Sequence, residues 1–321
     1  MDIKHILSIL GFLTISIIYN KYKGDDDFDD DSKHYNIVKE YLLNDSSLAQ
    51  SKNPILWIHM NYEINARNWE SFFSRNSCEL NQPYIFLTLK TIIDKCGKDF
   101  NVCLINDSTF AKILPNWNIN LQIVPEPIKN KIRTLAMAKL LYNYGGMTLP
   151  NSFICFKNLR QVYNKKTSGN NMFAGEFLDR NSTSMLYNFF PSSKILGCNK
   201  KCSKMEEYIK HIEIINAVDY TDESKFKGSI DKWLFDNKNN INIIPAQQLG
   251  IRDTNNKPIL IDELIGNSFI EFNNNILGVY IPADEILKRT TYQWFCRLSP
   301  KQVLDSDTMI GKYLVTNIEN I

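Results

Sequence analysis

The feature that most constrains the fold is an alternation of short apolar runs with segments of helical periodicity in the first half of the chain. Ile55–Met60 and Asn101–Asn106 are short apolar runs, which are typical of strands buried on both faces of a sheet. Residues 83–97 begin with proline and end with glycine, and Ile128–Asn143 carries apolar residues at helical spacing before Gly145-Gly146, so both segments predict helices. The order strand, helix, strand, helix favours an α/β fold with a parallel sheet and right-handed crossovers.

The second half is less regular, but it predicts further strands and helices of the same domain. The expected strands are Asn171–Phe177 and Ile276–Ile281, and the expected helices are Lys204–Val218, Ser224–Asn237 and Pro300–Leu304. No internal repeat is visible in the sequence. We therefore predict one α/β domain that spans residues 52–321.

The composition supports a large core and gives no basis for a nucleic-acid partner. Hydrophobic residues make up 44% of the chain, which is enough to bury a core of this size. The 37 Lys and Arg residues nearly balance the 35 Asp and Glu residues, so the net charge is only +2. Because binding to nucleic acid usually needs a basic face, we expect no nucleic-acid partner.

The seven cysteines do not form a recognisable framework. An odd number leaves at least one thiol unpaired within a monomer, and most of them lie in apolar segments, where a thiol behaves as a small buried hydrophobe. Cys198 and Cys202 are the one close pair, and they lack the spacing and the further ligands of a zinc site. A local disulfide between Cys198 and Cys202 remains an alternative.

An apolar run near the start of the sequence predicts a membrane anchor within residues 1–23. Ile6–Tyr19 is uncharged and almost wholly apolar. As a helix, residues 5–20 would extend roughly 24 Å against a hydrocarbon core of ~30 Å, and the flanking lysines could cover the difference. A cleaved signal peptide and a buried core helix are the alternatives, although no small-residue cleavage site follows the run and an acidic stretch does.

Residues 24–51 predict an acidic flexible stem, because the stretch DDDFDDD at 25–31 should remain solvated. We expect the membrane to be a partner through residues 5–20, as a single-pass anchor in an endomembrane, secretory or virus-associated membrane. The orientation stays open, because lysines lie on both sides of the run. Glycosylation sequons such as the one at Asn44 would permit a lumenal placement.

Residues 140–149, LLYNYGGMTL, resemble the segment LYxYGGxYLDxD of the Och1-like and capsular-polysaccharide glycosyltransferases. The run LWIH at 56–59 is similar to the opening strand of the same families, and the stretch from about 52 to 320 also resembles proteins of large DNA viruses that infect protists. The glycosyltransferase resemblance implies a GT-A fold, which is Rossmann-like with a mostly parallel sheet flanked by helices. It also implies a nucleotide-sugar donor and a glycan or glycoprotein acceptor.

One part of the family pattern is replaced in this chain. In the family an Asp-x-Asp after the glycines holds Mn²⁺ or Mg²⁺ against the donor diphosphate, but Pro150-Asn151-Ser152 stands in that place here. The family's Ser-Asp pair and its Arg on the preceding helix correspond to Arg133-Thr134 and Met137, and no histidine follows His211. We therefore expect no Mn²⁺ or Mg²⁺ site, and a protein that is either metal-independent or inactive.

The candidates for nucleotide-sugar binding are residues that match the family pattern or that lie at the end of a predicted strand. They are Trp57, His59, Arg133, Gly145, Gly146, Asn151 and Ser152. Arg133 would supply charge to a diphosphate bound without a metal ion, with Asn151 and Ser152 as hydrogen-bond partners. The plainer alternatives are a core tryptophan, a histidine with its hydrogen bonds satisfied, and a surface turn introduced by Pro150.

Glu176, Asp179 and Asp231 are the candidates for a catalytic base that deprotonates a sugar hydroxyl. Phe173 and Phe177 lie close to Glu176 in the sequence, and a carboxyl among apolar groups has a raised pKa that suits this role. A helix-capping acid and a solvated acid are the alternatives for each of them.

Two main functional hypotheses follow from these residues. The first is a glycosyltransferase-like protein that transfers sugar from a nucleotide-sugar donor to a glycan or protein. The second is a catalytically dead, glycosyltransferase-derived binding or scaffold protein anchored in a membrane. A structural virion or membrane protein is a third possibility, and a resemblance in fold does not choose among them.

Overall fold

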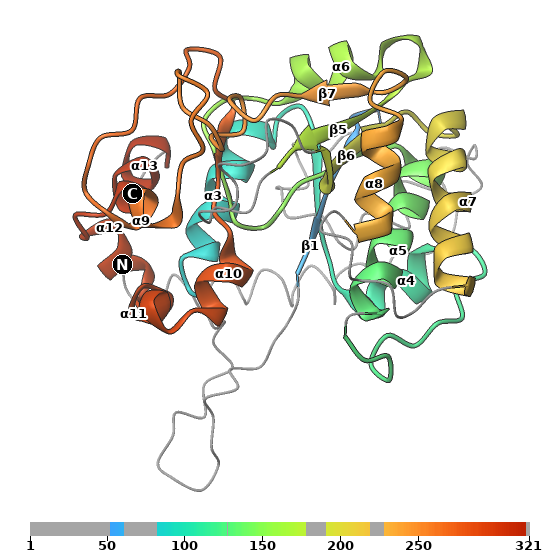
Figure 1. Cartoon of the computed structure of the whole chain (residues 1–321), viewed down its shortest axis with the longest axis horizontal. Helices are drawn as coiled ribbons and strands as arrows, with labels where there is room; N and C mark the ends of the chain where they lie inside the picture. Colours follow the sequence, from blue (N-terminus) through green and yellow to red (C-terminus); the bar gives the residue numbers. More distant parts are fainter. Residues whose placement is uncertain (1–51, 61–81, 127, 178–190, 219–227, 319–321) are drawn as a thin grey trace, which may run out of the picture.

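The computed structural model describes residues 52–60, 82–126, 128–177, 191–218 and 228–318. Its centre is a six-stranded sheet with the order β2-β1-β3-β6-β5-β7 (Figure 1). The strands of this sheet are β1 (Ile55–His59), β2 (Asn101–Ile105), β3 (Gly146–Thr148), β5 (Met172–Glu176), β6 (Pro191–Cys198) and β7 (Asn242–Ile244).

The sheet is mostly parallel. β1 pairs in parallel with β2 and with β3, and β5 pairs in parallel with β7. β6 is antiparallel to both of its neighbours, β3 and β5, so in the sheet as described it alone runs against the other strands. The prediction of an α/β fold with a mostly parallel sheet flanked by helices is therefore confirmed.

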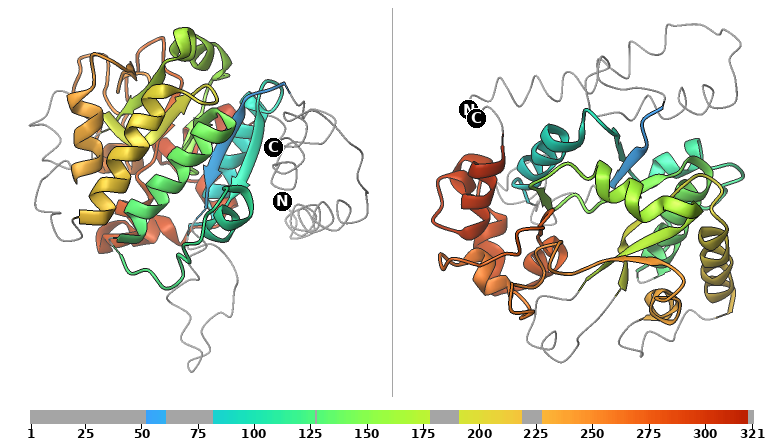
Figure 2. Two further views of the ribbon diagram at one scale, coloured as in Figure 1. Left: turned by 90° about the vertical axis from the view of Figure 1, so that its right-hand side faces the viewer. Right: turned by 90° about the horizontal axis from the view of Figure 1, so that it is seen from above.

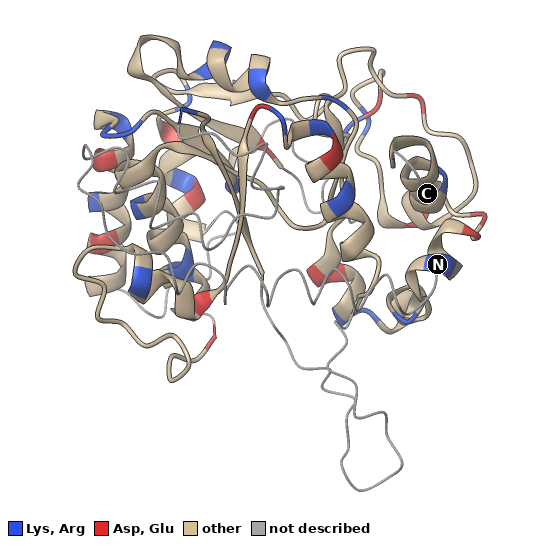
Figure 3. Ribbon diagram, turned by 180° about the vertical axis from the view of Figure 1, so that it is seen from behind, with Lys and Arg blue, Asp and Glu red and all other residues tan. Residues whose placement is uncertain are grey.

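Helices cover both faces of the sheet (Figures 1 and 2). The helices on one face are α4 (Asp107–Ile113), α5 (Ile128–Tyr144), α7 (Ser203–Val218) and α8 (Gly228–Asp236). The other face packs against α3 (Ile85–Cys96), α6 (Arg160–Thr167) and the C-terminal helices α9 (Ile261–Ile265), α10 (Ala283–Lys288), α11 (Gln293–Cys296), α12 (Pro300–Leu304) and α13 (Met309–Asn317). Both basic and acidic residues are distributed over the outer helices (Figure 3).

β1 shows why the strands of this sheet read as uninterrupted apolar runs. Leu56 and Ile58 belong to the core on the α3 side, and Trp57 belongs to the core on the α5 side. All three side chains have 0% exposure, because both faces of the strand are covered. Alternation of polar and apolar residues is therefore lost, as expected for a parallel sheet between two helical layers.

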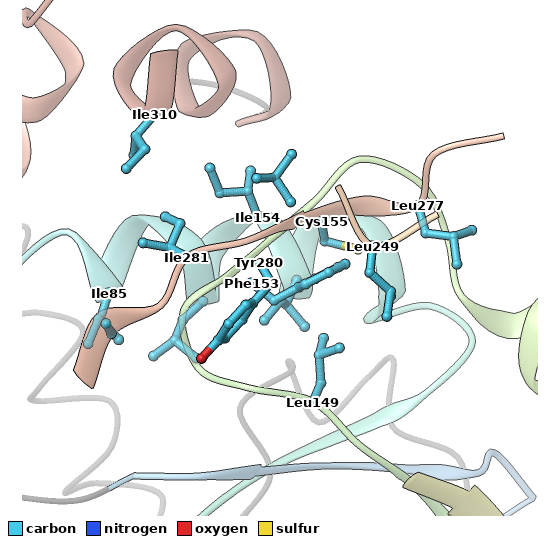
Figure 4. Packing of buried hydrophobic residues seen from close by; sticks show 14 of the residues in the cluster. Ile85, Leu149, Phe153, Ile154, Cys155, Leu249, Leu277, Tyr280, Ile281 and Ile310 are labelled. Atoms are coloured by element: carbon cyan, nitrogen blue, oxygen red, sulfur yellow. The ribbon is translucent and has the colours of Figure 1, made fainter. Parts of the chain in front are cut away.

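A second, two-stranded sheet pairs β4 (Phe153–Cys155) with β8 (Gly278–Tyr280) in antiparallel register. A side chain at Gly278 would collide with the carbonyl oxygen of Ile154, so the close approach of the two strands requires glycine there. Phe153, Ile154 and Tyr280 pack with aliphatic residues that include Ile310 of α13 (Figure 4). This small sheet ties the end of β3 to the C-terminal helices.

The predicted elements of the first half are present, since α3 follows Pro83 and α5 ends just before Gly145. In the second half, β5, α7, α8 and α12 fall within or close to their predicted ranges. The strand expected over Ile276–Ile281 is present as β8, but it lies in the small sheet. Two strands of the main sheet, β6 and β7, were not predicted.

The predicted anchor in residues 1–23 and the predicted stem in residues 24–51 lie outside the described residues. Within the residues that the structure does describe, none of the helices combines the length and the apolar character that a membrane crossing requires.

Candidate functional site at the carboxyl edge of the sheet

The carboxyl edge is the end of the main sheet at which β1, β2, β3, β5 and β7 finish and β6 begins, and the amino edge is the opposite end. From β1 the chain passes to β2 on one side, and it then returns to β3 on the other side of β1. This reversal is a topological switch point, and open α/β sheets bind ligands outside the carboxyl ends of their strands at such a point. The polar side chains at this end are therefore the first to consider.

A cluster of His59, Asp107 and Arg133 lies at the switch point. Nε2 of His59, the last residue of β1, lies 2.9 Å from Oδ1 of Asp107. Arg133 on α5 holds the same carboxylate at two points, because Nε donates to Oδ1 at 2.9 Å and Nη2 donates to Oδ2 at 2.7 Å. The ring of Phe110 stacks on the imidazole with centroids 5.4 Å apart. The imidazole of His59 is thus held in place by the contact of Nε2 with Asp107 and by the stacking of Phe110 on its face.

Local sequence explains where Asp107 lies. Asn106 follows β2 and caps α4, since its side chain accepts a hydrogen bond from the backbone N–H of Thr109 at 3.1 Å. Asp107 then occupies the first turn of the helix, where a negative charge is favourable. The polar pair Asn106-Asp107 directly after a strand was a usable signal in the sequence, yet Asp107 was not among the predicted site residues.

The charges of this cluster are largely matched within it. Burial by itself would raise the pKa of Asp107, but hydrogen bonds from His59 and Arg133 outweigh burial and hold that pKa well below its ordinary value. Nη1 of Arg133 also donates to Glu126 and to Asn130, at 3.1 Å each. Arg133 therefore contacts two carboxylates. To bind a diphosphate as predicted, it would have to release one of them.

Asn151 and Ser152 lie on the segment between β3 and β4, next to the end of β1. The amide of Asn151 donates to the sulfur of Met60 at 3.1 Å. The hydroxyl of Ser152 is buried and donates to the carbonyl of Ile281 at 2.7 Å. Ser152 therefore continues the pairing of β4 with β8 by one residue. Asn151 is partly buried next to Met60, at the carboxyl edge.

Trp57, Gly145 and Gly146 are directed toward the amino edge. The fully buried indole of Trp57 donates through Nε1 to the carbonyl of Gly145 at 3.0 Å. Both glycines have positive φ, of 74° and 95°, and a side chain at Gly146 would collide with the carbonyl oxygen of Ile55. These residues set the approach of α5 and β3 to β1, and the structure does not bring the glycines together with His59, Arg133 and Asn151.

Glu176 ends β5 at the carboxyl edge and is 6% exposed. One carboxylate oxygen accepts a hydrogen bond from the backbone N–H of Ala246 at 3.0 Å, and the other lies 3.7 Å from Nε of the buried Arg252. Burial raises the pKa of Glu176, and the contacts with Ala246 and Arg252 oppose that rise. The raised pKa matches the expectation from sequence, but the cause includes a buried ion pair that the sequence did not reveal.

Asp231 lies in the first turn of α8 and accepts a hydrogen bond from the backbone N–H of Ser193 at 2.9 Å. Burial raises its pKa, and the hydrogen bond from Ser193 opposes the rise. Because β6 begins at the carboxyl edge, this contact places Asp231 near the same edge as Glu176. Asp179, the third predicted base, lies outside the described residues.

Lys194 also lies at this edge, and sequence reasoning missed it. It belongs to the first half of β6, and its Nζ donates to the hydroxyl of Tyr280 at 2.7 Å. Only the antiparallel direction of β6 brings this part of the chain to the carboxyl edge. No local sequence pattern predicted β6.

Among the described residues, no group of three or more His, Cys, Asp or Glu side chains is arranged to hold a metal ion. What the fold and the site define together is a mixed α/β protein with a charged and polar cluster at the switch point of a mostly parallel sheet.

Comparison with known proteins adds one structural likeness. No family model matches the chain, and no curated protein matches it. Among solved structures, the chain is similar to the apo-form of the glycosyltransferase GlyE from Streptococcus pneumoniae TIGR4, with a TM-score of 0.36 and 14% sequence identity. The matched region covers 62% of this chain and 47% of the other, so the chain spans about half the length of that protein.

Proposed function

We propose that this chain is a glycosyltransferase-like protein that binds a nucleotide-sugar donor at the carboxyl edge and transfers the sugar to a glycan or protein acceptor. One observation carries the proposal: the switch point between β1 and β3 holds His59, Asp107 and Arg133 from three different elements. The resemblance of residues 140–149 to glycosyltransferases supports the choice of donor.

The acceptor hydroxyl needs a base, and Glu176 and Asp231 are the described candidates. Both carboxyls have a pKa raised mainly by burial, which brings them closer to the working range of a general base. Glu176 already has both oxygens engaged, by Ala246 and by Arg252. Asp231 also accepts hydrogen bonds, from Ser193 and from the side chain of Ser192. Because Glu176 is paired in addition with the buried Arg252, Asp231 is our first choice for the base.

Calorimetric titration of the full chain with UDP, GDP and their common sugars, with and without Mn²⁺, tests donor binding. We expect binding of at least one nucleotide sugar, and slow transfer or hydrolysis of that sugar. Asp231→Asn should lower the turnover rate by about 10²- to 10⁴-fold without weakening nucleotide binding, because a base acts on the acceptor rather than on the nucleotide. Absence of any nucleotide binding would contradict the proposal.

A binding protein without catalysis is the second candidate, and one observation favours it. Arg133 and Ser152, two of the side chains predicted to hold the diphosphate, are both used within the protein, by carboxylates and by the carbonyl of Ile281 respectively. Because these contacts oppose the binding of a diphosphate, absence of both nucleotide-sugar binding and turnover in every condition would support this second function, as a scaffold, over the first.

We also propose that residues 5–20 tether the protein to an endomembrane, secretory or virus-associated membrane, on the basis of their apolar sequence. Flotation of the full chain with lipid vesicles tests this. Replacing Leu10 and Leu13 by arginine should abolish flotation, because charges at the centre of an apolar helix oppose insertion. Unchanged flotation of this double variant would contradict the tether.

A further inference from the structure

Transfer of a sugar from a nucleotide donor leaves a nucleoside diphosphate, and the negative charge that develops on it needs a partner. Two of the basic residues on α5 are already matched with acidic groups. Arg133 is paired with Asp107 and Glu126, and Lys139 is paired with Glu213 at 2.7 Å. The carboxyl edge holds a further basic residue, Lys194 of β6, which interacts with Asp231.

β6 is irregular where it meets this edge. Ala174 of β5 pairs with Leu196 of β6. The next residue of β5, Gly175, pairs with Ser192, so residues 193–195 of β6 bulge out of the ladder. Bulges bend a strand, re-aim its side chains and are frequent beside functional sites. The centre of this bulge is Lys194.

The bulge lies across from the end of β3. The backbone N–H of Leu196 donates to the hydroxyl of Thr148, the last residue of β3, at 2.9 Å. Lys194 precedes Leu196 by two residues on β6, and because β3 and β6 are antiparallel it lies beyond the end of β3, toward the carboxyl edge. In the sheet order it lies on the side of β3 that faces away from β1.

Tyr280 holds the ammonium group of Lys194 at this position. Nζ donates to the phenol oxygen at 2.7 Å and lies 4.9 Å from the centroid of the ring. The ring itself is fixed, because Tyr280 is 4% exposed and pairs with Phe153 of β4 (Figure 4). It also packs edge-on against Phe177. Lys194 is exposed, so a rigid element presents its charge to solvent at the carboxyl edge.

We propose that Lys194, positioned by Tyr280, binds the diphosphate of the nucleotide-sugar donor and stabilises the departing nucleoside diphosphate. This inference rests on the proposed function. In the transfer step the acceptor oxygen forms a bond to the anomeric carbon while the bond from that carbon to the diphosphate oxygen breaks. The electron pair of the broken bond stays on the diphosphate, and the hydroxyl proton goes to the base. The ammonium keeps its protons and offsets the added charge.

The test is calorimetric titration of the full chain with UDP and GDP in the presence of EDTA. Lys194→Ala should weaken the better nucleotide by about 10- to 100-fold, the usual loss when a hydrogen bond to a charged group is removed. Lys194→Arg keeps the charge and should retain most of the affinity. Uridine and guanosine lack the diphosphate and should not distinguish the variants. Lys165→Ala, an exposed lysine in the last turn of α6, is the matched control and should bind as wild type does.

The outcomes separate this inference from the proposed function. Equal affinity of wild type and Lys194→Ala for the diphosphate would overturn the role of Lys194 and leave donor binding intact. Binding that needs Mn²⁺ would overturn it too, because a lysine that supplies the charge makes the ion unnecessary. If wild type binds no nucleotide in any condition, the proposed function fails and this inference fails with it.

Discussion

The two edges of the main sheet use polar groups in opposite ways. At the amino edge the indole of Trp57 and the hydroxyl of Tyr163 donate to backbone carbonyls, at 3.0 Å and 3.1 Å. There Gly146 approaches the backbone of Ile55 so closely that no side chain would fit. At the carboxyl edge, Asp107, Glu176 and Asp231 all have shifted pKa values and contact groups from other elements. The comparison separates residues that set the geometry from residues that are available for chemistry.

The comparison also changes the meaning of the double glycine. Gly145-Gly146 is the most recognisable part of the sequence, but it lies at the amino edge and serves backbone packing. The residues suited to chemistry lie about five positions further on and on other strands. The two glycines therefore set the start of β3 and contribute no side chain to the carboxyl edge.

Gly146→Ala should have the largest effect, a loss of at least about 3 kcal/mol in the free energy of unfolding. Its φ is 95°, and the new methyl group would collide with the carbonyl oxygen of Ile55. Gly169→Ala is the control, since Gly169 also has positive φ but no neighbour within 4 Å, so it should cost only about 1–2 kcal/mol. Urea unfolding measures both, and equal losses would show that the close approach is unimportant.

Trp57→Phe should cost about 1–3 kcal/mol, because it leaves the buried carbonyl of Gly145 without its indole donor. If Trp57 belongs only to the amino edge, nucleotide affinity should stay unchanged. Urea unfolding and calorimetry on the same variant check the two statements. A large loss of affinity with little loss of stability would return Trp57 to the binding site, as the sequence first suggested.

The His59 cluster should make the protein sensitive to acid. The folded pKa of Asp107 is lowered, so its contribution to stability is fully present above the unfolded value of about 3.9 and is lost as the pH falls below it. Asp107→Asn should be less stable than wild type at pH 7, by about 1–2 kcal/mol, and the difference should shrink below about pH 4. A pH-independent difference would show that Asp107 contributes nothing through its charge.

The contribution of Asp231 to stability should depend on pH in the opposite direction, and this effect should be the smallest. Its folded pKa is raised, chiefly by burial, so the wild-type carboxyl costs stability as the pH rises from the unfolded value through the folded one. The stability of Asp231→Asn relative to wild type should therefore improve between about pH 4 and pH 7. Urea midpoints at these two values measure the change, and a shift in favour of wild type would contradict the raised pKa.

Much of the fold could be predicted from the sequence, because the signals were local. Proline before α3, glycine after α5 and apolar runs at β1 and β2 each lie within one segment and report on that segment alone. The site could be predicted only in part. His59 and Glu176 end predicted strands, and the structure places both at the carboxyl edge. The partners of these residues come from distant segments, and no local pattern reports them.

By itself, the sequence determined the class of the protein, since strands without polar alternation need helices on both faces. It also shows that no carboxylate stands at Pro150-Asn151-Ser152, downstream of the double glycine. The pairing of Arg133 with Asp107 became visible only in the folded protein, as did the antiparallel direction of β6, which brings Lys194 to Tyr280 of the small sheet. The physical reason is that strand direction and ion pairing depend on contacts between segments far apart in the chain, and those contacts exist only once the core has closed.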